Sequence, residues 1–477
     1  MATRRDFLKG MSVLTLGSMV APETAIAKTA KFSQKAKYVF YFIGDGMGVN
    51  PVNMTEIYRA EMEGRIGVKP LLFTTFPYGS MATTYSVTSS VTDSSAGGTA
   101  LACGHKTYNG AIAVDADKNR LTTIAEKAKK AGRKVGIVTS VSIDHATPAS
   151  FYAHQPDRGM YYEIANDLVK ADFEFYAGAG FLKPQVDGKP NVYDIFKENG
   201  YTVAKGIAEY KEKAGSAKKM ILRNYSGQSQ DSLKYAIDRQ PGDLSLKELT
   251  ESAIDFLMKG KDTGFFMMVE GGKIDWAGHS NDAATEIREI EDMDEALAVA
   301  YEFYKKHPKE TLIVVSADHD TGGLGLATTQ YALELKNFQY QKQSTDVLND
   351  AIVNLAKSKD GNVSWDDIRA LLSERMGFWD KVELNWDQEQ QLFKAYGEMF
   401  RAHTGKEEKT LYSKSSELAA TAKRIMSQKA LVGWSTGCHT AGYVPVFAVG
   451  AGAEQFCHKM DNLEISSYIS AVAGYKD

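Results

Sequence analysis

The sequence predicts an α/β fold with a large, mostly parallel central sheet flanked by helices on both faces. Several short apolar runs, rich in Val, Ile and Phe, each end in glycine or in a polar cluster. Continuous apolar runs of this length are typical of strands that are covered on both faces. Helix-like stretches separate them, for example residues 121–131 and 282–306. This alternation indicates an open, mostly parallel sheet.

The apolar runs that we interpret as strands cover residues 37–43, 134–138, 265–269, 311–315 and 444–449. In open α/β sheets the ligand site lies beyond the carboxyl ends of the strands. Acidic and histidine residues gather at those ends in this chain. Fold and chemistry therefore predict a functional site at the same edge of the sheet.

Residues 331–430 differ in character from the rest of the chain. They are rich in charge, Gln and Trp, have a helical pattern and contain no apolar run that ends in a polar cluster. We interpret them as a helical or irregular, crown-like insertion in the α/β core, which spans residues 28–330 and resumes at 431–477. The alternative is a separate C-terminal domain. The strand-like run at 444–449 favours the insertion.

Residues 1–27 have the pattern of a twin-arginine signal peptide. Arg4 and Arg5 precede a modestly apolar stretch, and an Ala-Ile-Ala segment ends at Ala27, where we expect cleavage. This predicts export by the twin-arginine machinery, to the periplasm or out of the cell. The alternative is a short amphipathic helix with two chance arginines. The apolar stretch is too short and too interrupted by glycine to span a bilayer, so no stable membrane span is expected.

The bulk composition excludes some classes of protein. With 477 residues, 43% of them hydrophobic and 24% charged, the chain can bury a substantial core and does not resemble a disordered protein. A net charge of -4 without a long basic run argues against nucleic-acid binding. The sequence has Cys103, Cys438 and Cys457, so at least one is unpaired within the chain, and it does not decide whether Cys438 and Cys457 form a bridge.

The first two motifs in the chain contain a candidate metal ligand and a candidate nucleophile. Asp45 lies between glycines at a strand end, where backbone and carboxylate can approach a cation closely, although a simple Asp turn shows the same pattern. Ser94 follows Asp93 and precedes small residues that open an apparent helix, which places its Oγ at a positive helix terminus. A neighbouring metal ion could then activate it. An ordinary helix cap at Asp93 or Ser94 is the alternative.

Further candidate metal ligands follow the later strands. Glu270, Asp275 and His279 lie within ten residues after one strand, Asp318 and His319 follow the next, and His439 precedes the last. Carboxylate and imidazole ligands together suit zinc, whereas Glu270 with a threonine hydroxyl suits a harder ion such as magnesium. Any one of these histidines has an ordinary structural alternative, but four strands with candidate ligands at or close to their ends indicate a metal centre.

The segment from His145 to Arg158 adds two more candidates. The planar guanidinium of Arg158 can bind two phosphate oxygens at once. Thr147 directly precedes Pro148, so its hydroxyl is held on rigid backbone.

Taken in order, these segments resemble the alkaline phosphatase family. The ordered motifs are GDGMG, TDSSAGGTA, HATPASFYAH with Arg158, EGGKIDWAGH, ADHDTGG and finally His439-Thr440. The resemblance extends from Asp45 to the end of the chain, and only the insertion lacks a signature. A single motif of this kind means little, but the ordered set is highly specific.

The resemblance implies a complete site and reaction. The implied ligands are Asp275, His279 and His439 for one zinc ion, Asp45, Asp318 and His319 for a second that also meets Ser94, and Asp45, Thr147 and Glu270 for a magnesium ion. Each subunit would thus hold two zinc ions and one magnesium ion. Ser94 would be phosphorylated by a small-molecule phosphate monoester and then hydrolysed, while Arg158 holds the phosphoryl oxygens. Family members are usually homodimers, in which the insertion forms a crown over the site.

Three further residues are expected beside the substrate or the third metal site. They are Asp93, His145 and Trp276. The best-known bacterial members of the family carry Asp at the position of His145 and Lys at the position of Trp276, whereas other members have His or Trp there.

Two other readings of the same residues remain open. A phosphodiesterase or sulfatase can use a similar metal scaffold, but diesterases commonly use a threonine nucleophile and sulfatases a modified Cys or Ser in a different motif. Ser94 after Asp93 favours monoesters. An exported protein that binds metal or phosphate without catalysis is the other alternative, and the presence of nucleophile, arginine and full ligand set argues against it.

Overall fold

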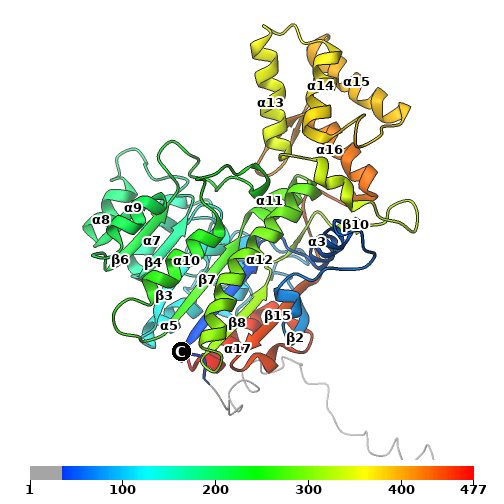
Figure 1. Cartoon of the computed structure of the whole chain (residues 1–477). Helices are drawn as coiled ribbons and strands as arrows, with labels where there is room; N and C mark the ends of the chain where they lie inside the picture. Colours follow the sequence, from blue (N-terminus) through cyan, green and yellow to red (C-terminus); the bar gives the residue numbers. More distant parts are fainter. Residues whose placement is uncertain (1–34, 477) are drawn as a thin grey trace, which may run out of the picture. The chain divides into compact units, whose positions relative to one another are not determined.

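The central feature of the fold is a ten-stranded sheet (Figure 1). The computed structural model describes residues 35–476, so the predicted signal peptide lies outside the described residues. In spatial order the strands are β16 (Met460–Asp461), β2 (Tyr78–Thr83), β15 (Val444–Gly450), β8 (Thr311–Ser316), β1 (Tyr38–Gly44), β7 (Phe265–Gly271), β3 (Lys134–Thr139), β4 (Phe175–Gly178), β6 (Lys219–Arg223) and β5 (Tyr201–Lys205).

The sheet is parallel except at one strand. β15 runs antiparallel to both of its neighbours, β2 and β8, and all other pairs are parallel. The predicted α/β class with a mostly parallel sheet is thus confirmed. The five apolar runs that we interpreted as strands correspond to β1, β3, β7, β8 and β15.

Helices cover both faces of the sheet. On one face α10 (Leu246–Leu257) and α12 (Ala283–Lys306) pack against each other and over the central strands. On the other face lie α5 (Ile124–Lys130), α17 (Asn462–Ala473) and α4 (Ser94–Cys103), which packs on α17. Because both faces are covered, every residue of β1, β7 and β8 is buried, as their apolar sequences predict.

The remaining elements connect the strands or lie outside the sheet. Before the insertion these are α3 (Val49–Glu61), α6 (Ala146–Ala149), α7 (Tyr161–Ala171), α8 (Val192–Glu198), α9 (Gly206–Lys213), α11 (Lys273–His279), β9 (Asp320–Thr321), β10 (Leu324–Leu326) and the 3₁₀ turns η1 (Phe73–Thr75) and η2 (Ala236–Asp238). After it come β13 (Val432–Trp434), β14 (His439–Thr440) and η4 (Ala453–Phe456).

Between β10 and β13 the chain leaves the sheet and forms mainly helices. They are η3 (Leu335–Tyr340), α13 (Thr345–Ser358), α14 (Trp365–Met376), α15 (Trp386–Phe400) and α16 (Glu417–Ala430), with a small hairpin of β11 (Glu407–Lys409) and β12 (Lys414–Ser416). Their buried side chains share one apolar cluster with residues of α3 and α12. The described residues belong to one compact unit, and the boundaries 28–330, 331–430 and 431–477 stay a prediction.

Two sequence expectations concern features outside the site. Across the part of the chain that the structure describes, every helix is too short or too polar to cross a membrane. Cys438 and Cys457, whose pairing the sequence left open, are both free and exposed, and Cys103 is free as well.

Candidate functional site

Three carboxylates meet where neighbouring strands end. β1 is paired in parallel with β7 and β8, so Ile43 lies beside both Glu270 and Ser316. Asp45 follows β1 by one residue and Asp318 follows β8 by two. Asp45, Glu270 and Asp318 are all fully buried. The register of the parallel strands therefore brings these carboxylates together, as the sequence predicts.

Ser94 is the first residue of α4. Asp93 caps this helix, with its carboxylate accepting a hydrogen bond from the Ala96 backbone N–H at 3.0 Å. The Ser94 side chain consequently lies at the positive end of a ten-residue helix. Its Oγ is 3.1 Å from Nε2 of His319, and the residue is fully buried.

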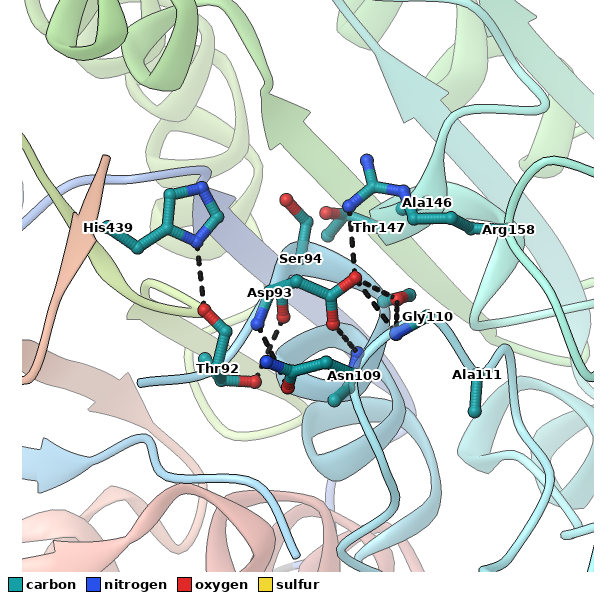
Figure 2. A network of polar contacts seen from close by, with 12 residues as sticks. Thr92, Asp93, Ser94, Asn109, Gly110, Ala111, Ala146, Thr147, Arg158 and His439 are labelled. Carbon is teal, nitrogen blue, oxygen red and sulfur yellow. Dashed lines mark hydrogen bonds and ion pairs between the residues drawn. The ribbon is translucent and has the colours of Figure 1, made fainter. Parts of the chain in front are cut away.

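Arg158 reaches over the start of α4, beside Asp93 and Ser94 (Figure 2). Its guanidinium contacts the Asp93 carboxylate at 3.2 Å. Burial opposes ionisation of Asp93, but the charge of Arg158 and hydrogen bonds from Ser95 and two backbone N–H groups outweigh it and hold the Asp93 pKa below its usual range. Asp93 thus orients the arginine and also caps the helix that begins with the candidate nucleophile Ser94.

One cluster of candidate metal ligands consists of Asp275, His279 and His439. Nδ1 of His279 lies 2.7 Å from the Gly437 carbonyl. Nδ1 of His439 lies 2.8 Å from the Thr92 carbonyl, and Figure 2 shows this contact. A carbonyl only accepts hydrogen bonds, so both protons are on Nδ1.

The two unprotonated Nε2 atoms of this cluster therefore face each other, at 3.1 Å, and lie 3.4 and 3.6 Å from the Asp275 carboxylate. Three lone-pair donors converge with no hydrogen among them. Such an arrangement is repulsive unless a cation lies between the donors, and its chemistry fits zinc.

A second cluster consists of Asp45, Asp318 and His319. The Thr321 hydroxyl donates to Asp275 at 2.6 Å, so it must accept the proton of His319 Nδ1, 3.2 Å away. The lone pair of His319 Nε2 then faces Asp45 at 3.2 Å and Asp318 at 3.3 Å. This nitrogen is the atom that Ser94 contacts, so the nucleophile candidate lies at the second cluster.

The third cluster contains Asp45, Glu270 and His145. Both ring nitrogens of His145 and Oε1 of Glu270 are buried without a hydrogen-bond partner within the described residues. The Thr147 hydroxyl lies 3.3 Å from both Asp45 and Asp318. The predicted ligand Thr147 is therefore beside this cluster, and His145 adds a nitrogen donor that the expected ligand set did not include.

The electrostatics of the second and third clusters also favour cations. Burial, and then the negative charge of Asp275, raises the pKa of Asp318 to about 7. Burial raises that of Glu270 to about 8, with a further contribution from Asp318. Burial, and then Arg158, lowers the His145 pKa to about 3. The raised carboxyl pKa values mean that the ionised carboxylates are unfavourable unless a cation compensates them. The neutral imidazole of His145 has a lone pair that can bind such an ion.

The structure also places a residue in the site that sequence reasoning missed. Tyr412, from the hairpin turn between β11 and β12, stacks on Trp276 with ring centroids 4.5 Å apart and an angle of 13°. The same ring contacts His145 and His279 at 5.7 and 5.5 Å. Trp276 itself lies 6.1 Å from His145. No motif marks Tyr412, because it lies in the insertion, which lacks a signature.

These features define the site of a metal-binding α/β enzyme, and the comparisons with known proteins identify its family. The family model for alkaline phosphatase matches residues 36–175 and 183–475. Alkaline phosphatase 3 of Bacillus subtilis is 32% identical over 477 residues, which cover 98% of this chain and 96% of that protein.

Solved structures agree with the sequence match. The cold-active alkaline phosphatase of a Shewanella species has a TM-score of 0.76 at 30% identity and covers 91% of this chain and 99% of its own. The alkaline phosphatase of Thermus thermophilus has a TM-score of 0.78 at 27% identity, covering 97% and 96%. The chain belongs to the alkaline phosphatase family, and it is a phosphatase.

Proposed function

We propose that the protein is an exported alkaline phosphatase that hydrolyses small-molecule phosphate monoesters through a phosphoserine at Ser94. The observation that carries the proposal is the position of the Ser94 Oγ, at the start of α4 and 3.1 Å from the His319 nitrogen that also faces Asp45 and Asp318. The candidate nucleophile therefore lies in contact with the same nitrogen atom that faces the candidate metal ligands Asp45 and Asp318.

In this proposal the three clusters hold two zinc ions and one magnesium ion per subunit. Asp275, His279 and His439 would hold one zinc ion, Asp45, Asp318 and His319 the second, and Asp45, Thr147 and Glu270 the magnesium ion. When bound, such ions lower the pKa of a coordinated hydroxyl or water and stabilise charge on the attacking and leaving oxygens.

The residues of the chain supply the other parts of the mechanism. Arg158, held by Asp93, binds two phosphoryl oxygens through its planar guanidinium. The N-terminus of α4 stabilises negative charge on the Ser94 Oγ. Oγ attacks phosphorus while the bond to the alcohol breaks. Water then attacks phosphorus, the bond to Oγ breaks, and phosphate leaves.

His145 bears on the identity of the third ion. Its unpartnered nitrogens lie with Asp45 and Glu270, and a nitrogen donor favours zinc over magnesium, which prefers oxygen ligands. A solved variant of the alkaline phosphatase from the Antarctic bacterium TAB5, in which a histidine is replaced by aspartate, has magnesium bound in the site named M3. If metal analysis of the purified protein finds three zinc ions per chain, the third ion is zinc and not magnesium.

The proposal includes export by the twin-arginine machinery and a homodimer. Arg4, Arg5 and the Ala-Ile-Ala segment that ends at Ala27 support export. Fusion of residues 1–30 to a reporter, compared with the same fusion carrying Arg4→Lys and Arg5→Lys, tests it. Light scattering of the purified protein tests the dimer.

The reaction itself is tested by substrate comparison and acid quenching. We expect p-nitrophenyl phosphate to be hydrolysed far faster than bis-p-nitrophenyl phosphate or p-nitrophenyl sulfate, and [³²P]phosphate to be recovered on Ser94 after quenching. Faster turnover of the diester or the sulfate ester would make the protein a phosphodiesterase or a sulfatase. Phosphate binding without turnover of any ester would make it a binding protein.

A further inference from the structure

The turn that contains Tyr412 is internally rigid. The Thr410 Oγ1 accepts hydrogen bonds from the backbone N–H groups of Ser413 and Tyr412 at 3.0 and 3.4 Å. The Thr410 backbone N–H in turn donates to the Ser413 carbonyl at 2.9 Å. These bonds hold the Tyr412 backbone between two short strands, so its side chain has a defined direction.

The hairpin is also fixed to the end of the active-site helix α11. Lys423, which is 4% exposed, donates to the Ser280 carbonyl and to the Glu408 carboxylate, both at 2.6 Å. Ser280 directly follows His279, and its hydroxyl lies 3.5 Å from that of Ser413. A buried cation thus joins β11, the hairpin strand that contains Glu408, to the residue after a proposed zinc ligand.

The Tyr412 ring lies among the residues of the site, with its centroid 5.7 Å from that of His145 and 5.5 Å from that of His279. Its hydroxyl is the polar group of the hairpin turn that lies in this part of the fold. It is buried and has no well-formed hydrogen bond within the described residues. Burial and the Asp275 and Asp45 carboxylates raise the pKa of the phenol, and the Arg158 guanidinium is near enough to lower it. A buried hydroxyl without a partner costs free energy unless a ligand completes it.

We propose that the Tyr412 hydroxyl donates a hydrogen bond to the phosphoryl group that Arg158 binds, so that the hairpin supplies a substrate contact. The inference rests on the proposed function. A phenol donates one hydrogen bond and remains neutral at working pH. Stacking on Trp276 holds the ring so that this hydroxyl is in place before the substrate binds.

The variant Tyr412→Phe tests the contact, because it keeps the ring and its stacking and removes only the hydroxyl. A lost hydrogen bond to a charged group should lower kcat/KM for p-nitrophenyl phosphate about tenfold and weaken inhibition by inorganic phosphate by a similar factor. The midpoint temperature of thermal unfolding of Tyr412→Phe should equal that of the wild type. Tyr475→Phe is the matched control, since it removes another buried hydroxyl without a partner within the described residues, and it should leave kinetics unchanged.

A purely structural role for Tyr412 gives a different result. If the ring acts only by stacking on Trp276, Tyr412→Phe will match the wild type in kcat/KM and phosphate inhibition while Tyr412→Ala loses activity, and this outcome overturns the proposal. Calorimetric titration with inorganic phosphate tests the Tyr412 contact independently of whether the protein hydrolyses phosphate esters. Wild-type protein that binds phosphate more tightly than Tyr412→Phe supports the contact even if no ester is hydrolysed, and equal affinity refutes it.

Discussion

The protonation of the site histidines is set by hydrogen bonds to their outer nitrogens. The Gly437 and Thr92 carbonyls hold the protons of His279 and His439 on Nδ1, and Thr321 does the same for His319. All three Nε2 atoms are thereby free to bind metal. Thr321 is the most informative of these partners because its hydroxyl contacts two proposed ligands, His319 and Asp275, at once.

The variant Thr321→Val should weaken metal binding about 10- to 100-fold, because it removes the partner that fixes the His319 proton. Metal content after dialysis against graded chelator concentrations measures the effect. Thr55→Val is a matched control, since the Thr55 hydroxyl is buried and donates to the helix carbonyl of Pro51 at 2.9 Å. Equal metal retention by wild type and Thr321→Val would contradict the assigned role.

Sequence reasoning succeeded for residues that follow strands and failed for those brought in by tertiary contacts. Asp45, Glu270 and Asp318 could be predicted to lie together because parallel strands end at one edge. The contact of Tyr412 with Trp276 joins residues 136 positions apart in the chain. A pattern within one segment carries no information about such a partner, and the carbonyls of Gly437 and Thr92 leave no signal at all.

At the scale of elements, the position of α4 depends on residues without bulky side chains. A Cβ on Gly97 would lie 2.9 Å from the backbone oxygen of Asp318, and one on Gly98 would lie 2.9 Å from the Ser150 hydroxyl. The helix that begins with Ser94 can therefore approach the end of β8 closely. The small residues after Ser94 thus place the proposed nucleophile next to the second cluster of candidate metal ligands.

The pair Gly97→Ala and Gly397→Ala tests this role of α4. In Gly97→Ala the backbone of Asp318 must shift or α4 must move away, and a displacement near 1 Å should lower kcat on the order of a hundredfold. Gly397 lies within α15 with nothing within 4 Å of an added Cβ, so Gly397→Ala should keep full activity and stabilise by about 0.5–1 kcal/mol. Wild-type kinetics in Gly97→Ala would show that the close approach is not required.

The antiparallel strand β15 explains how His439 reaches the site. The other central strands end at the site edge, whereas β15 begins there, so a residue before it comes to the same place. His439 is further fixed by pairing of β14 with β9, opposite Thr321. The sequence predicted the strand and the nearby histidine but not the strand direction. An apolar run indicates that a strand is buried, but it does not indicate whether the strand is parallel or antiparallel to its neighbours. The strands β2, β4, β5, β6 and β16 were not identified from the sequence.

At the scale of the whole molecule, the buried carboxylates form a concentration of negative charge inside the fold. Asp45, Glu270, Asp275 and Asp318 are all fully buried, and burial with their mutual repulsion raises the pKa of three of them, namely Asp45, Glu270 and Asp318. Ionised carboxylates in this arrangement destabilise the fold unless cations compensate them. Metal binding is therefore expected to contribute to folding as well as to catalysis.

Metal removal should lower thermal stability. Zinc at about 100 times its Kd stabilises a protein by about 2.7 kcal/mol per site. For a chain of this length that corresponds to about 3 °C per site, so the transition of chelated protein should rise by roughly 6 °C when both proposed zinc sites are refilled. Differential scanning calorimetry measures this shift. Ser94→Ala should show the same rise, because Asp45, Asp318 and His319 remain. Equal transition temperatures with and without metal would contradict a metal-filled site.

The measurement that tests the central claim most directly is hydrolysis of p-nitrophenyl phosphate at alkaline pH by wild type and Ser94→Ala, before and after EDTA, with zinc and magnesium restored. Ser252→Ala, a buried helical serine on α10, controls for the substitution. We predict activity in the wild type and control that is lost on chelation and regained with metal, and a fall of several orders of magnitude in Ser94→Ala. Full activity in Ser94→Ala, or none in metal-loaded wild type, would contradict the account.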